Sequence, residues 1–149
     1  MTFSPRRVVT GHDPDGRPVI LIDQRMSNIV SRRPGQLETQ IWSTDADLGK
    51  GVDRKESELR EADARIASET VFRLVNYAPG VAPLPHGNEW IDYTIIVSGE
   101  IHMQLDEATE VQLKAGDVVV QRGTIHNWIN RGTAHCTVAF VRVGARPEQ

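Results

Sequence analysis

The sequence predicts an all-β fold, a single domain closed as a jelly-roll β-barrel or a double-sheet jelly roll. Short apolar runs rich in β-branched residues recur along the chain, and Gly, Pro, Asn or Asp bounds nearly all of them. The length of 149 residues suits one domain, expected to span residues 1–149, and 39% hydrophobic residues are enough for one core. We expect the sheet to close on itself, because a closed sheet leaves few free edges.

Seven runs are expected to be strands, at residues 7–10, 18–22, 70–77, 93–97, 101–105, 118–121 and 137–143. A turn should join the first two runs into a hairpin. There Pro14 fixes φ, Asp15 can bond its own backbone and Gly16 accepts a positive φ. Further tight connections are expected at 106–109 and 130–133.

Residues 45–69 break the strand pattern, with 8 acidic and 5 basic residues and few large apolar side chains. Leu59, Ala62 and Ile66 form a weak helical stripe. We therefore expect a short helical or irregular insertion, solvated and packed on the barrel rim. A mobile lid over a pocket is the alternative.

Charge and composition exclude several classes of protein. With 17 basic and 20 acidic residues the net charge is -3, which argues against a nucleic-acid binder with a broad basic surface. No run approaches the roughly 18 apolar residues of a membrane span, and the N-terminus lacks the apolar segment of a secretory signal. The single cysteine, Cys136, cannot form an internal disulfide and is expected to be a small core residue. These observations predict a cytoplasmic protein.

Two glycine-containing stretches, residues 80–99 and 116–130, carry the candidate functional residues. The first follows the spacing G-x5-H-x-H-x3,4-E-x6-G, with Asn88 at the second histidine and Asp92 at the glutamate; its other matching positions are Gly80, His86 and Gly99. The second follows G-x5-P-x-G-x2-H-x3-N at Gly123, His126 and Asn130, but Gln121 replaces the proline and Gly116 lies one residue too close. With these motifs the chain resembles the cupin superfamily, as a small single-domain barrel with a degenerate first motif.

Strand geometry offers a physical reason for the spacing. Residues i and i+2 of a strand share a face, so His86 and Asn88 are expected to point the same way. Asp92 can return on the adjacent strand, whereas His126 joins the group only if the sheet closes on itself. The side chains are then expected to face one cavity.

The resemblance implies a divalent metal (Fe, Mn, Ni or Zn) at the positions of His86, Asn88, Asp92 and His126. Asn is a poor transition-metal ligand, and Asp reaches less far than Glu. Two His and one Asp remain, a set that holds non-haem Fe(II) or catalytic Zn²⁺ in other folds. Asn88 would then orient a water or a substrate carbonyl. A metal-free, hydrogen-bonded cluster of His86, Asp92 and His126 is the alternative that stays open.

Other side chains are weaker candidates. Trp90 and Trp128 lie close to the motif positions and are expected either to stack on a flat substrate or to pack in the barrel. Arg73 and Arg122 are either partners of an anionic substrate or ordinary surface residues. The remaining histidines are expected to face solvent, namely His12, His102 and His135.

Three functions fit these observations. The first is a metal-dependent enzyme on a small organic molecule, with oxygenase, isomerase, decarboxylase or lyase chemistry left open. The second is a metal-free isomerase or dehydratase with His126 or Asp92 as general base. The third is a non-catalytic ligand-binding barrel. No nucleotide or organic cofactor and no nucleic-acid or membrane partner are expected, and the resemblance implies a homodimer.

Overall fold

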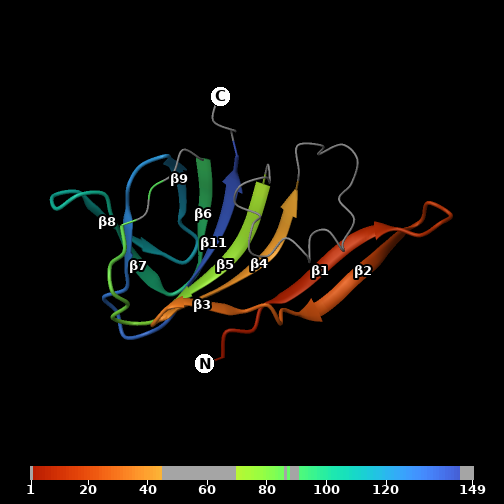
Figure 1. Cartoon of the computed structure of the whole chain (residues 1–149), viewed down its shortest axis with the longest axis horizontal. Coiled ribbons are helices and arrows are strands. Elements are labelled where there is room, and N and C mark those ends of the chain that lie inside the picture. The colour runs from red at the N-terminus through yellow and green to blue at the C-terminus, as the bar shows by residue number, and fades with distance from the viewer. Residues whose placement is uncertain (1, 45–69, 86, 88–90, 145–149) are drawn as a thin grey trace.

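Buried and exposed residues alternate along most strands, and this alternation folds the chain into two facing β-sheets and a separate hairpin (Figure 1). The structure, a computed structural model, describes residues 2–44, 70–85, 87 and 91–144. The predicted insertion at 45–69 lies outside the described residues, as do His86, Asn88 and Trp90. No helix able to cross a membrane occurs in the described part of the chain.

All regular elements of the described residues are strands. They are β1 (Arg6–His12), β2 (Pro18–Arg25), β3 (Val30–Arg33), β4 (Gln36–Thr44), β5 (Thr70–Tyr77), β6 (Ile91–Ser98), β7 (Glu100–Gln104), β8 (Glu110–Lys114), β9 (Val118–Arg122), β10 (Asn127–Ile129) and β11 (Cys136–Val143). The larger sheet has six strands in the order β3-β4-β5-β11-β6-β9, and the smaller sheet has three in the order β10-β7-β8. The all-β cupin-type prediction is confirmed, with the closure taking the form of a two-sheet sandwich.

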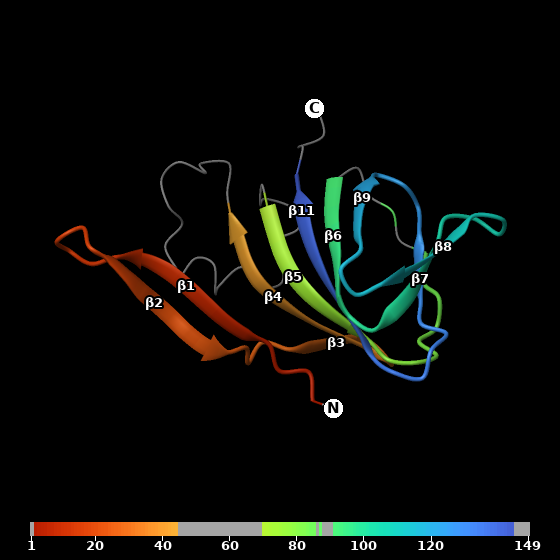
Figure 2. The same cartoon turned by 180° about the vertical axis from the view of Figure 1, so that it is seen from behind.

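The first two strands form the predicted hairpin. Its turn is held by Asp13, whose Oδ1 accepts hydrogen bonds from the backbone N–H groups of Asp15 and Arg17, both at 2.9 Å. Asp13 therefore fills the role expected of Asp15, while Gly16 has the predicted positive φ of 79°. The hairpin extends past the six-stranded sheet in both face-on views (Figures 1 and 2).

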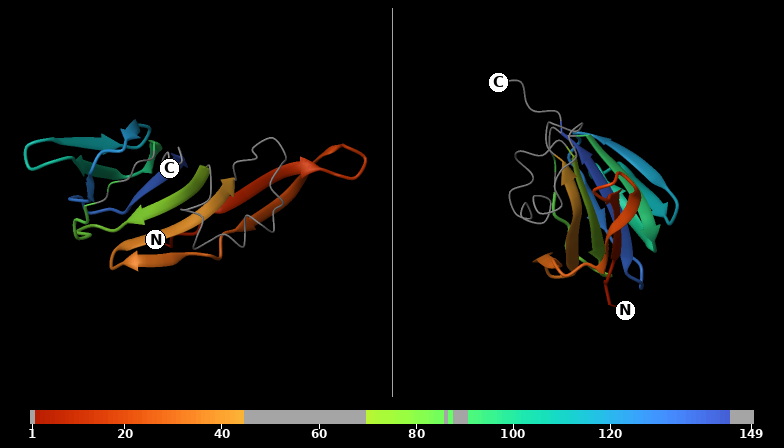
Figure 3. Two further views of the ribbon diagram at one scale, coloured as in Figure 1. Left: turned by 45° about the horizontal axis from the view of Figure 1, so that its top comes forward. Right: turned by 90° about the vertical axis from the view of Figure 1, so that its right-hand side faces the viewer.

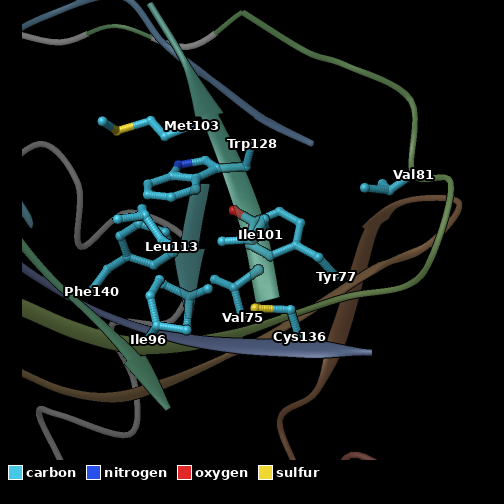
Figure 4. Packing of buried hydrophobic residues seen from close by; sticks show 11 residues of the cluster. Val75, Tyr77, Val81, Ile96, Ile101, Met103, Leu113, Trp128, Cys136 and Phe140 are labelled. Carbon is cyan, nitrogen blue, oxygen red and sulfur yellow. The ribbon is translucent and has the colours of Figure 1, made fainter. Parts of the chain in front are cut away.

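The two sheets pack as neighbouring layers around one apolar cluster (Figures 3 and 4). Trp128 of β10, in the smaller sheet, packs against two aromatic residues of the larger sheet. Its ring centroid is 5.6 Å from that of Phe140 on β11 and 6.5 Å from that of Tyr77 on β5. Aromatic packing of this kind adds to the free energy gained from apolar burial.

The antiparallel register arranges the inner face of the large sheet in rows, because directly opposed residues share a face. One row consists of Val75, Val138 and Ile96, which are all buried in the apolar cluster. The next row towards the upper end of Figure 1 consists of Arg73, Phe140 and Thr94. The last consists of Val71, Arg142, Asp92 and Gln121. The inner face therefore changes from apolar to polar along the strands, and we call the Asp92 side the polar end.

Gly99 joins the two sheets between β6 and β7. Its φ is 79°, and a Cβ atom there would lie 2.5 Å from the carbonyl oxygen of His135 and 3.0 Å from Cα of Cys136. Both the backbone conformation and the close approach of β11 require glycine. This motif glycine is therefore explained by packing.

The seven predicted runs all overlap strands, and β5 has the predicted bounds. The strands β3, β4, β8 and β10 are additional. β4 carries polar residues that are buried on both faces, Glu38 on the inner face and Thr39 on the outer. β4 is a strand because it pairs with β3 and β5. Its sequence contains no apolar run from which the strand could be predicted.

We expect Cys136 to resist alkylation in the folded protein. It has no exposed surface, and burial raises the pKa of its thiol to about 11, so the reactive thiolate should fall on the order of a hundredfold at neutral pH. The measurement is the rate of iodoacetamide labelling with and without guanidinium chloride. Native labelling as fast as that of the unfolded chain would contradict this packing.

Candidate functional site

Two of the predicted site residues, Asp92 and His126, lie buried at the polar end, each 4% exposed. Asp92 is the second residue of β6, and His126 directly precedes β10. The other predicted residues of the first motif, His86, Asn88 and Trp90, lie outside the described residues. The structure therefore describes one histidine and the one carboxylate of the predicted ligand set.

Asp92 has a buried polar neighbour on each side. The register places it opposite Arg142 of β11 and opposite Gln121 of β9, and all three share the inner face. Directly opposed residues have Cβ atoms about 4.5–5.5 Å apart, so a buried cation lies next to the buried carboxylate. The opposite charge of this neighbour offsets part of the free-energy cost of burying a charged group.

The imidazole of His126 is fixed in one tautomer. Its Nδ1 lies 2.8 Å from the backbone carbonyl oxygen of Thr124. A carbonyl oxygen can only accept, so Nδ1 carries the proton and donates it, and the neutral ring has its lone pair on Nε2. Metal-binding histidines commonly have their second nitrogen fixed by this type of hydrogen bond.

Gln121 links the large sheet, the small sheet and the loop that holds His126. Its Oε1 accepts a hydrogen bond from Oγ1 of Thr124 at 2.8 Å, and its Nε2 contacts the sulfur of Met103 on β7. Because Thr124 also supplies the carbonyl that fixes His126, Gln121 supports the orientation of that ring. In the sequence, Gln121 stands at the position where the second motif has proline. This replacement was noted in the motif but was not recognised as a sign of a positioning role.

Thr94 contributes a further polar group to the inner face. It follows Asp92 by two residues, is 1% exposed, and its Oγ1 has no hydrogen-bond partner among the described residues. A buried hydroxyl without a partner costs free energy unless a water or ligand completes it. Thr94 therefore belongs with the candidate site, although no motif position selects it.

The other candidates divide between the core and the surface. Trp128 packs in the apolar cluster with its ring centroid 5.8 Å from that of His126, in edge-to-face geometry. Arg73 lies on the inner face, whereas Arg122 is exposed and paired with Ile91 on the outer face. His12 and His135 are exposed and His102 is partly exposed. Nδ1 of His135 also donates to Asn76 Oδ1 at 2.8 Å.

The motif residue Asn130 has a structural role. Its Nδ2 donates to the carbonyl oxygens of Tyr77 and Ala134, at 3.0 and 2.9 Å, and its Oδ1 accepts from the N–H of Gly132 at 3.0 Å. These bonds hold the connection between β10 and β11 against the end of β5. Asn130 is thus far from the polar end and contributes to folding.

Within the described ranges, no three His, Cys, Asp or Glu side chains come together as a metal site. The two described members of the predicted set nevertheless have suitable chemistry. His126 has a fixed Nδ1–H and its lone pair on Nε2, and Asp92 is a buried carboxylate on β6 of the other sheet. Imidazole and carboxylate are ligands for Fe, Mn, Ni and Zn. His86, which would complete the set, lies outside the described residues.

Comparison with known proteins agrees with the fold and the motifs. The cupin domain family matches residues 73–142. The cupin-domain-containing oxidoreductase fogC of Aspergillus ruber is 32% identical over 144 residues, which cover 91% of this chain and 70% of that protein. The chain belongs to the cupin family.

A second relative of this cupin, the phomopsin biosynthesis cluster protein C' of Diaporthe leptostromiformis, is 46% identical over 79 residues. That match covers 52% of this chain and only 42% of the relative, so it spans less than half of the relative's length.

Solved cupin structures share the fold. KdgF from Halomonas sp. has a TM-score of 0.55 at 15% identity, over 79% of this chain and 87% of that one. An RmlC-like cupin from Shewanella frigidimarina has the same TM-score and identity, over 82% of this cupin and 87% of that chain. At these identities the likeness concerns the fold alone.

We expect nitrogen NMR to find the neutral His126 ring protonated on Nδ1. The Thr124 carbonyl accepts that proton, whereas the exposed His12 should show the tautomer mixture of a solvated imidazole. Long-range nitrogen–proton correlation spectra distinguish the two nitrogens. A His126 ring protonated mainly on Nε2 would contradict the assignment.

Proposed function

We propose that this cupin is an oxidoreductase that acts on a small organic molecule, using a divalent metal held by His86, Asp92 and His126. The observation that carries the proposal is the His126 ring, buried at the polar end with its Nδ1–H bonded to a backbone carbonyl. The printed names of several relatives support the oxidoreductase class. Besides fogC they include srdD of Neurospora crassa, 30% identical over 83% of this chain, and virC of Hypocrea virens, 28% identical over 95% of it.

The roles of the chain's own residues follow from their positions. Nε2 of His126 and the carboxylate of Asp92 would bind the metal, and Arg142 lies beside that carboxylate on β11. Thr124 and Gln121 hold the His126 ring, so little reorganisation is needed on binding. When bound, the metal would polarise a carbonyl or enediol oxygen and, as iron, activate O₂.

The substrate side of the proposal involves three further residues. Asn88 offers one acceptor and two donors and would orient a water or a substrate carbonyl. Trp90 would contact a flat substrate. Trp128, which packs against His126, would shape the apolar wall next to the reacting group. The low exposure of Asp92 and His126 indicates that bulk water is largely excluded, which strengthens electrostatic interactions with the substrate.

Metal analysis tests this proposal. Purified wild-type protein should bind one Fe(II), Mn(II), Ni(II) or Zn(II) per chain, and His126→Ala should weaken binding by more than about a hundredfold, since even outer-shell changes cost 10- to 100-fold. Asn88→His should tighten binding by adding a fourth protein ligand. His12→Ala, at an exposed histidine of the hairpin turn, is the matched control and should bind like wild type.

Two results would count against a metal enzyme. If wild type and Asn88→His both bind no divalent metal, the metal-dependent function is wrong, and a metal-free general base or a ligand-binding barrel takes its place. If His126→Ala binds as tightly as wild type, the metal lies elsewhere.

We also propose that the protein is a homodimer and that the outer face of the large sheet forms its interface. Strands β6 and β9 present exposed apolar side chains there, namely Ile91, Tyr93, Ile95, Val97, Val118 and Val120. Monomers rarely expose a contiguous apolar patch of this kind. The β1–β2 hairpin, which pairs with no other strand in the described part, exposes Val8, Ile20 and Leu21. A second copy would provide both apolar surfaces reciprocally, as a two-fold interface requires.

Light scattering after size exclusion should give twice the chain mass for wild type. The double variant Tyr93→Lys/Val120→Lys places two charges in the middle of the outer face and should give a monomer. Val111→Lys, at an exposed apolar residue of the small sheet, is the control and should stay dimeric. A monomeric wild type, or a dimeric double variant, would show that this face is not the interface.

A further inference from the structure

A buried carboxylate surrounded by arginines lies on the inner face, away from Asp92 and His126. Glu38 of β4 has a side chain only 6% exposed and forms ion pairs with Arg32 of β3 and, at 2.9 Å, with Nη1 of Arg73 on β5. Two guanidinium groups thus share one carboxylate. The cluster therefore carries an excess positive charge, and the nearby Tyr77 phenol, whose pKa is raised by burial, adds no negative charge.

Arg73 is held in place, and within the described part of the chain only its Nη1 donates a hydrogen bond. Its guanidinium carbon lies 4.9 Å from the centroid of the Phe140 ring, and Glu38 binds it through Nη1. A guanidinium has five N–H donors, and the side chain of Arg73 remains 30% exposed. An arginine fixed by a carboxylate and a ring loses little entropy when it binds a second anion.

The position of Arg73 relates it to the catalytic candidates. It lies in the same row as Phe140 and Thr94, next to the row that contains Asp92. Contacts run from Arg73 to Phe140, from Phe140 to Trp128 and from Trp128 to His126. One strand, β11, lies between β5 and β6, so at about 4.8 Å per spacing the strands that carry Arg73 and Asp92 are roughly 10 Å apart across the sheet. That is about the length of a small organic molecule.

We propose that Arg73 binds the carboxylate of the substrate and that the substrate of this cupin is a small organic acid. The proposal rests on the proposed function for its reacting end, which would lie at His126 and Asp92. Arg73 then sets both affinity and orientation, because a planar guanidinium binds a carboxylate through two parallel hydrogen bonds. Thr94, whose buried hydroxyl has no partner among the described residues, would contact the middle of the molecule.

Binding of simple probes tests this separately from catalysis. Benzoate, phenylacetate and succinate are compared with benzamide, phenylacetamide and succinamide by ligand-observed NMR and calorimetry. The protein is treated with EDTA, so that no carboxylate can bind through a metal.

Wild type should prefer the carboxylates. Arg73→Gln should weaken carboxylate binding on the order of ten- to a hundredfold and leave amide binding unchanged. Arg73→Lys, which keeps the charge but loses the planar fork, should fall between the two.

The matched control is Arg131→Gln, which removes an exposed arginine that pairs with Glu110 of β8 in the same way. It should bind the probes like wild type. If Arg73→Gln does not fold, Arg73→Lys decides, and a carboxylate affinity equal to that of wild type overturns the proposal. It is also overturned if wild type shows no preference for carboxylates over amides, or if Arg131→Gln weakens binding as much as Arg73→Gln.

The same variants distinguish this proposal from the proposed function. Arg73→Gln should bind the divalent metal like wild type, whereas His126→Ala should lose the metal and still prefer carboxylates after EDTA treatment. Carboxylate binding that depends on Arg73 in a protein without metal affinity would support the acid subsite and contradict the metal enzyme. Metal binding without a carboxylate preference would contradict only the subsite.

Discussion

The pairing of β11 with β5 on one side and β6 on the other determines the arrangement of the interior. This double register brings Arg142 next to Asp92, Phe140 next to Arg73, and Val138 between Val75 and Ile96. A shift of one residue would turn each of these side chains to the outer face, because strand residues alternate. The apolar cluster and the polar end therefore depend on the same set of backbone hydrogen bonds.

The interior combines two energetic regimes within one pair of sheets. At the apolar end, burial of Trp128, Ile96 and their neighbours stabilises the fold. Towards the polar end, charged and hydrogen-bonding groups are buried, which costs free energy unless each has a partner. Contacts such as those of Gln121 with Thr124 and Met103 reduce that cost and also hold the two sheets together. Burial at the apolar end thereby stabilises a fold that also contains the buried polar groups of the polar end.

Local sequence patterns predicted the strands with apolar, β-branched runs, such as β5, and the hairpin turn at Gly16. They missed β4, because Glu38 and Thr39 become buried only through partners that lie far away in the chain. Motif spacing selected Asp92 and His126, which are both buried in the structure. Arg142 could not be selected in this way, since 50 residues separate it from Asp92 and only the register of β11 brings them together.

Gly99 lies at one end of the sandwich, and the connections at the two ends are held in different ways. At its end of the sandwich the chain passes from sheet to sheet within a single residue. Backbone hydrogen bonds also tie Ala115 to Gly99 and Gly116 to Ile96, so an insertion there would disturb the spacing between the layers. At the opposite end, side chains hold the segment that leaves β9, through the contacts of Gln121 with Thr124 and Met103. Side chains at that end can therefore be exchanged one at a time, whereas an insertion near Gly99 would disturb the backbone bonds that set the spacing of both layers.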